Sequence, residues 1–191
     1  MVNVLSPADN QAVTQAINKA EGRTSAELMT VIAKASDHYQ SFLLLYGLML
    51  GSLIDLTLWY HYGVTYFPLL LLIQCTAITV MFIRPLAHLC YHLIPLHIRR
   101  HHAAHRAFSE YLHLTRHVAT AKPIVLFYVS LAERYVHILP NKIVRDAIPD
   151  ARWEAVVQNF TRKLPKDGLK NASLMAIDQM ADMLSTVFPI S

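Results

Sequence analysis

The chain has 191 residues, of which 54% are hydrophobic and 16% are charged, with a formal net charge of +4. This length has room for one ordinary domain of about 100–200 residues. The cysteines, Cys75 and Cys90, lie outside any CxxC spacing, which excludes a ribbon-type zinc site. Several arginines come directly after a long apolar segment, where basic residues usually set the orientation of a membrane protein. We therefore attribute the positive charge to this topogenic signal and expect no nucleic-acid binding.

Residues 1–40 predict the first part of a folded module. Ser6 can cap a helix whose first turn holds Pro7 and Asp9, as helix starts often do. After this helix, residues 28–33 predict a short buried strand. Because the segment lacks a basic start followed by an apolar run, we expect no signal peptide and a cytoplasmic N-terminus.

Residues 41–84 predict a transmembrane hairpin. Its two apolar runs, 42–60 and 64–83, are separated only by residues 61–63. At about 1.5 Å per helical residue, each run approaches the roughly 30 Å thickness of the hydrocarbon core. Aromatic residues gather at the turn as in an interfacial belt, namely Trp59, Tyr60, Tyr62, Tyr66 and Phe67. The alternative is a soluble core hairpin, which a small domain can hardly cover on every side.

Residues 85–100 form a juxtamembrane segment in this interpretation, apolar at first but too short to span a bilayer. Arginines follow the second apolar run, namely Arg84, Arg99, Arg100 and Arg106. The turn of the hairpin contains neither lysine nor arginine. Because basic residues favour the cytoplasmic side, we expect a multi-pass protein of the inner (cytoplasmic) membrane with both termini in the cytoplasm.

Residues 101–191 predict the second part of the folded module. A helix from residue 98 to about residue 117 carries an apolar stripe that includes Phe108. Residues 123–131 are almost wholly apolar, which fits a central strand covered on both faces. Residues 134–139 alternate more and can pair with that strand after a short turn.

A helix capped by Asp150 and a final amphipathic helix over residues 169–184 complete the chain. The order of these elements predicts an α/β fold, an αβα sandwich with a small mixed sheet. In this sheet the strand near Val31 joins the pair near Val125 and Val136. The two-helix transmembrane hairpin then interrupts the sandwich as an insertion.

Most of the eleven histidines lie between His88 and His117, several of them four residues apart. This spacing lets two imidazoles share a divalent metal on one helix face, with His97, His101 and His105 as candidate ligands. The alternative is a mildly basic helix face whose histidines and arginines meet anionic headgroups. In that case liposome binding strengthens from about pH 7.5 to pH 5.5. No other cofactor is predicted.

Asp55 is the charged residue inside the apolar runs. An ionisable group in a membrane is costly and is a functional candidate. It also lies about one turn from Trp59, near the end of its run, so its carboxylate can reach the headgroups. An interfacial position, a partner contact and a role with an ion all stay open.

Support for catalysis is thin. Metal-dependent phosphoryl chemistry needs convergent carboxylates, and Asp146 and Asp150 are the pair whose spacing allows it. Asp150 also serves as a helix cap, while Asp178 and Asp182 fit the solvated face of the last helix. Because GxSxG, GxGxxG and P-loop motifs are all absent from the sequence, no catalytic residue is predicted.

Three stretches, in this order, resemble the TPM domain family. Residues 17–37 (INKAEGRTSAELMTVIAKASD) are similar to its opening helix, turn and first strand. Residues 108–140 (FSEYLHLTRHVATAKPIVLFYVSLAERYVHILP) are similar to its helix, threonine-bearing loop and paired strands. The segment from Trp153 through Gly168 to residues 188–189 is similar to its terminal pattern. An inserted hairpin at this point resembles a bacterial membrane-bound subgroup.

The resemblance implies an αβα sandwich with a small mixed sheet. Family members have been linked to acid phosphatase activity, to calcium binding and to assembly or maintenance of membrane complexes, so the fold does not fix the function. Where the family has an acidic residue and then a glycine after the paired strands, this chain has Asn141, Lys142 and Ile143. The positive charge of Lys142 argues against calcium binding and metal-assisted hydrolysis.

The function expected from these observations is that of a non-catalytic, membrane-anchored accessory module. Its partners are the lipid bilayer and a membrane or cytoplasmic protein that it holds near the bilayer. The first alternative is a weak metal-dependent phosphatase-like hydrolase. The second is a histidine-based metal-binding protein.

Overall fold

The computed structural model describes residues 6–36, 39–63, 65–83, 90–116, 118 and 122–190. The chain divides into two compact units. Met1–Ser36 and Arg100–Ser191 form the first, which we call the folded unit, and Asp37–Arg99 form the second, which we call the hairpin unit. The hairpin unit therefore interrupts the folded unit in the sequence. The finer boundaries predicted at residues 40, 84 and 100 stay predictions.

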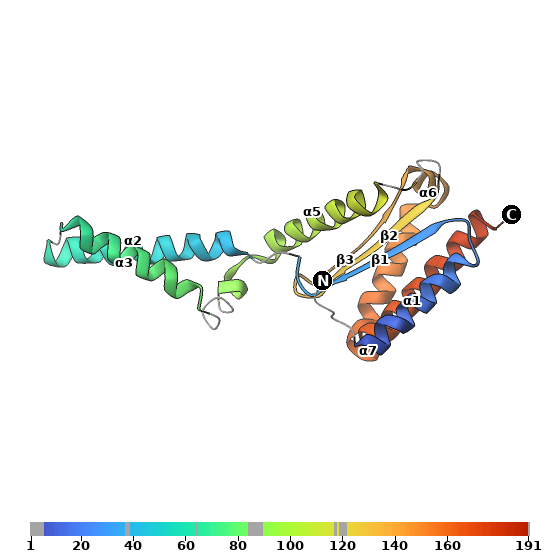
Figure 1. Cartoon of the computed structure of the whole chain (residues 1–191), viewed down its shortest axis with the longest axis horizontal. Helices are drawn as coiled ribbons and strands as arrows, with labels where there is room; N and C mark the ends of the chain where they lie inside the picture. The colour runs from blue at the N-terminus through green and yellow to red at the C-terminus, as the bar shows by residue number, and fades with distance from the viewer. Residues whose placement is uncertain are drawn as a thin grey trace. The chain divides into compact units, whose positions relative to one another are not determined.

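A three-stranded mixed sheet lies at the centre of the folded unit (Figure 1). β1 (Glu27–Ala33) pairs in parallel with β2 (Ile124–Ser130), and β2 pairs antiparallel with β3 (Tyr135–Pro140). The sheet order is β1-β2-β3. The predicted α/β class, with a small mixed sheet assembled from these three segments, is confirmed.

Burial of the strands follows their order in the sheet. Every residue of β2 is buried, because this strand has a neighbour on each side and helices over both faces. The prediction of a buried first strand is wrong, since β1 lies at an edge and encloses only Leu28 fully. The register aligns Glu27 with Ile124, and Val125 with Pro140.

Helices cover both faces of the sheet. α1 (Pro7–Glu21) and α7 (Asp150–Val187) pack on one face, and α5 (Leu96–Thr115) packs on the other (Figure 1). Successive strand residues alternate between the two layers. Phe127 therefore belongs to the core beneath α1 and α7, whereas its neighbour in β2 packs against Ala107 of α5.

Of the two predicted helix caps, Ser6 is confirmed and Asp150 is wrong. Ser6 caps α1, and its Oγ accepts a hydrogen bond from the Asp9 N–H at 3.1 Å. Asp150 does not cap α7, because Pro149 holds that position with extended backbone. Asp150 is instead the first helical residue, where its negative charge complements the helix dipole.

Gly168 divides α7 into two halves. Its backbone lies at φ 77° and ψ 170°, a left-handed conformation that glycine adopts without a steric penalty. A helix begins at Asp150 and another follows the break, as the sequence predicts.

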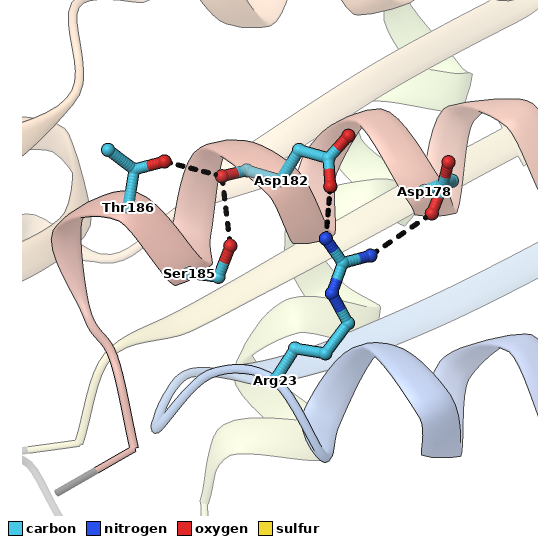
Figure 2. Close-up of polar contacts among 5 residues, drawn as sticks. All are labelled: Arg23, Asp178, Asp182, Ser185 and Thr186. Carbon is cyan, nitrogen blue, oxygen red and sulfur yellow. Dashed lines mark hydrogen bonds and ion pairs between the residues drawn. The ribbon is translucent and has the colours of Figure 1, made fainter.

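An ion-pair cluster joins the turn after α1 to the second half of α7 (Figure 2). The Arg23 guanidinium donates to Asp178 at 3.2 Å and also to Asp182. The hydrogen bond to Asp182 is the main cause that raises the pKa of Arg23. Both aspartates are exposed, as predicted, so the cluster contributes little stability and mainly orients the two helices.

The hairpin unit contains two antiparallel apolar helices. α2 (Gln40–Tyr62) is slightly longer than the predicted run, and Gly63 ends it with φ 62°. α3 (Phe67–Met81) has 15 residues, so the prediction of a second helix over residues 64–83 is wrong in length. At about 1.5 Å per residue, α3 is roughly 22 Å long. Its start is set by Pro68, which suits the first turn of a helix.

Candidate functional site

The two helices of the hairpin unit meet along a pair of glycines. An added Cβ at Gly47 would lie 2.7 Å from Ile78 Cα, and one at Gly51 would lie 2.5 Å from Gln74 Oε1. Gln74 Nε2 donates a hydrogen bond to the Leu48 carbonyl at 3.2 Å. Small residues four apart allow this close approach in membrane helices. Sequence reasoning missed this contact, although the Gly-x-x-x-Gly spacing is visible in the sequence.

The outer surfaces of α2 and α3 are apolar and exposed. Their most exposed aliphatic side chains are Met49, Leu53, Leu56 and Leu72. Among the described residues, α2 is the one helix long and apolar enough to cross a membrane, with mean hydropathy 1.8 over its most apolar window. Only 17% of that window is buried, so the helix does not resemble the enclosed core helix of a soluble protein.

Asp55 is half-buried in α2. It follows Gly51 by one turn, so its Cα lies on the side of α2 that faces α3. Its Oδ1 is buried and has no hydrogen-bond partner among the described residues. A buried carboxylate oxygen without a donor is costly, which makes a contact with a partner or a headgroup favourable.

The histidine candidates lie on α5. His101 and His105 come together, with 3.1 Å between their Nε2 atoms and 4.5 Å between their ring centroids. His97 is one turn earlier on the same helix and is exposed. His88 and His117 lie outside the described residues. Within the described ranges, no group of three or more His, Cys, Asp or Glu side chains is arranged to hold a metal ion.

The arginine candidates have different surroundings. The Arg99 guanidinium lies 4.6 Å from the centroid of the Tyr91 ring, and Arg106 pairs with Glu110 at 2.8 Å. Arg100 is exposed, and Arg84 lies outside the described residues.

The exposed face of α5 also carries apolar side chains. Of the helix's apolar residues, Ala103 and Ala107 are buried, whereas Phe108, a member of the predicted apolar stripe, is exposed. Leu112, one turn later, is exposed as well. Apolar and basic side chains on one exposed helix face are typical of helices that lie on a membrane surface.

A buried polar network lies at the carboxyl ends of β1 and β2. Both carboxylate oxygens of Glu133 accept from the Ser36 N–H at 3.1 Å, and Oε2 also accepts from the Ser130 hydroxyl. Ser36 Oγ donates to Ser130 Oγ at 2.8 Å and lies 2.9 Å from the Tyr128 hydroxyl. Burial raises the pKa of the Tyr128 phenol. Because Glu133 is fully enclosed, this network holds the chain at Ser36 and leaves the carboxylate no open side for a substrate.

A cavity of about 500 Å³ lies along the outer edge of β3. Its walls come from β3, from α6 (Lys142–Ala147) through Arg145, and from the first turns of α7. Asp150, Trp153 and Glu154 are among the α7 residues that line it. Sequence reasoning missed this cavity, because it depends on which strand lies at the sheet edge and where the helices cross.

The acidic residues considered for hydrolysis belong to two different helices. Asp146 lies in α6 and Asp150 begins α7, and both side chains are exposed. The turn that departs from the TPM pattern is a helix start, in which Asn141 Oδ1 accepts from the Val144 N–H at 3.1 Å. Asn141 Nδ2 also donates to the Lys122 carbonyl at 2.7 Å. The Asn141 side chain therefore already forms structural hydrogen bonds.

No family model matches the chain, and no curated protein matches it. Among solved structures, the chain is similar to the NMR structure of the BA42 protein from the psychrophilic bacterium Bizionia argentinensis. The match has a TM-score of 0.60 and 15% sequence identity, and it covers 100% of this chain and 88% of that chain. At this identity the likeness shows the fold alone, a mixed α/β arrangement.

Proposed function

We propose that this chain is a membrane-anchored, non-catalytic accessory module with a TPM-like domain. The hairpin unit inserts into the bilayer, and the folded unit holds a protein partner at the membrane surface. The module belongs to the inner (cytoplasmic) membrane, and both termini lie in the cytoplasm.

The observation that carries the proposal is the exposed apolar surface of the hairpin unit. α2 has 23 residues, which correspond to about 34 Å of helix and exceed the roughly 30 Å hydrocarbon core. Leu53 of α2 is 61% exposed and Leu72 of α3 is 63% exposed. Contact of these apolar side chains with water is unfavourable in free energy, whereas contact with lipid does not carry this cost.

The shorter α3 is compatible with insertion. A helix shorter than the bilayer core is accommodated by local thinning or by residues that flank it, at a modest cost per ångström. Trp59 and Tyr66 lie near the turn of the hairpin and are exposed, which suits the headgroup region. The close contact at Gly47 and Gly51 supplies the packing that holds such a pair together in lipid.

Membrane extraction and topology reporters test the proposal. Full-length chain should stay in the membrane pellet after alkaline carbonate treatment and should require detergent for release. A reporter fused after Ser191 should show a cytoplasmic position, and one inserted at Tyr62 should show the opposite side. A chain that remains monomeric in the aqueous fraction without detergent would contradict the proposal.

A second candidate function is divalent metal binding on α5. The 3.1 Å separation of the His101 and His105 Nε2 atoms favours it, since both nitrogens can turn toward one ion. Zinc binding to the full chain in detergent, followed by calorimetry, should then be lost in the double variant His101→Ala, His105→Ala. Equal zinc binding by both proteins would exclude this site.

A further inference from the structure

The outer edge of β3 carries backbone groups that no strand uses. The Asn141 N–H donates to the Ile124 carbonyl at 2.9 Å, and bonded pairs alternate along an antiparallel ladder. The residues of β3 bonded to β2 are then Tyr135, His137 and Leu139. Val136 and Ile138 consequently direct their N–H and C=O groups away from β2. In the part of the chain that the structure describes, no further strand pairs with β3.

The cavity of about 500 Å³ lies beside this edge, and Trp153 is one of its lining residues. Trp153 and Val157 of α7 give it an apolar wall. Trp153 is only 4% exposed, and its Nε1–H has no hydrogen-bond partner among the described residues. The indole therefore contributes mainly apolar surface to the cavity wall.

The cavity also has an acidic side. Asp150 and Glu154 lie one turn apart at the start of α7, and among the described residues neither forms an ion pair. The nearby Arg145 guanidinium is directed at the Pro140 carbonyl, 3.4 Å away. A positively charged group on a ligand is therefore complementary to this side of the cavity.

We propose that the outer edge of β3 and this cavity bind an extended segment of a protein partner. The segment adds as a strand beside Val136 and Ile138, places an apolar side chain against Trp153 and Val157, and places a lysine or arginine beside Glu154. This inference rests on the proposed function, because it names the surface through which the module holds its partner.

An extended segment fits these observations better than a helix or a small molecule. Strand addition uses main-chain hydrogen bonds for affinity and side-chain pockets for specificity. Only an extended backbone meets the row of outward N–H and C=O groups along β3. The cavity then accepts one side chain of the segment, and a single position of the partner carries the basic group.

Selection from a displayed library of short random peptides tests the proposal on the full chain in nanodiscs. Enriched peptides should alternate apolar and polar residues and should contain a lysine or arginine. Synthetic versions should change the fluorescence of Trp153 on binding, because the indole lines the cavity. Enrichment of amphipathic helical peptides, or of none, would overturn the proposal.

Two pairs of variants assign the contact. Val136→Pro removes the outward N–H, and proline is tolerated at such edge positions, so peptide affinity should fall about tenfold. Val136→Ala is the matched control, since it loses side-chain packing but keeps the N–H. Glu154→Lys should weaken binding by about tenfold or more, whereas Asp146→Lys makes the same charge change outside the cavity and should not.

Melting temperatures show which variants fold. If Val136→Pro does not fold, the comparison of Glu154→Lys with Asp146→Lys decides alone. Equal affinity in all the folded variants would overturn the proposal. Carbonate extraction of the same proteins keeps the two ideas apart, because a chain that binds the peptides yet leaves the membrane contradicts anchoring without contradicting the β3 site.

Discussion

Substitution of Glu133 should lower the stability of the folded unit. It is fully enclosed, and its carboxylate accepts from Ser36 and Ser130. Glu133→Ala leaves these buried donors without an acceptor, and we expect it to reduce the free energy of unfolding by about 2–3 kcal/mol. Denaturation of the full chain in detergent, followed by near-ultraviolet circular dichroism, measures this loss.

Glu133→Gln provides the matched control. Its amide oxygen still accepts one hydrogen bond while the shape of the side chain is kept, so the loss should be smaller than in Glu133→Ala. Equal stability of wild type and Glu133→Ala would show that the network does not hold the sheet at Ser36.

His137 gives the stability of the folded unit a dependence on pH. The His137 side chain is exposed but lines the β3 cavity, where partial shielding from water lowers its pKa in the folded state, whereas the unfolded chain keeps the ordinary value of about 6.5. Between these two values the unfolded state binds more protons, so acidification favours unfolding. The melting temperature should therefore fall as the pH drops below about 6.5.

The variant His137→Gln isolates this effect. Glutamine does not titrate, so the slope of melting temperature against pH should be shallower than in the wild type between about pH 7.5 and 5. A wild-type melting temperature that rises on acidification would contradict the assignment. His101→Gln, the same substitution at an exposed position of α5, is the control.

At the scale of elements, the two glycines of α2 should differ in their tolerance of alanine. An added Cβ at Gly47 meets the backbone of Ile78 at 2.7 Å, whereas one at Gly51 meets the end of the flexible Gln74 side chain. Gly47→Ala must separate the helices, and we expect it to destabilise the hairpin by about 1–3 kcal/mol. Gly51→Ala should cost less because Gln74 can turn away.

Thermal unfolding of the two variants in the same detergent measures this difference. Ser52→Ala, at the exposed position next to Gly51, should leave the melting temperature unchanged. Equal effects at Gly47 and Gly51 would show that α2 and α3 are not held at the observed separation.

The elements were predictable where one local signal decides the structure. β2 is an almost wholly apolar run and is the buried central strand, and Ser6 is a helix cap. The predicted burial of β1 was wrong, because burial depends on neighbouring elements. β1 lies at an edge of the sheet and is only half-buried. Asp150 was predicted to cap α7, but the preceding Pro149 already holds the cap position with extended backbone. Asp150 is therefore the first residue of the helix.

The candidate sites were less predictable than the elements. The spacing of His101 and His105 follows from helical periodicity, and the structure places the two rings together. The β3 cavity joins residues of β3, α6 and α7 that no motif links. The burial of Trp153 Nε1 and the place of Glu154 on the cavity wall are properties of packing, so they are known only from the folded structure.

At the scale of the whole molecule, one chain combines two compact units with different surfaces. The folded unit encloses its apolar residues between helices and a sheet, whereas the hairpin unit exposes them. The proposed function accounts for both patterns, because it places the first unit in water and the second in lipid. The Glu133 network holds Ser36, the last residue of the folded unit before the insertion.

Charges on the outer surface of the hairpin unit test this division. The double variant Leu53→Arg, Leu72→Arg places two cations at exposed positions of α2 and α3. Each arginine near the centre of a span costs about 2.5–3.5 kcal/mol of insertion free energy, so carbonate extraction should release much of the protein. Ile190→Arg, at an exposed apolar position of the folded unit, is the control and should leave the protein in the membrane pellet. If the double variant is extracted like the control, lipid does not surround these helices and the anchoring role fails.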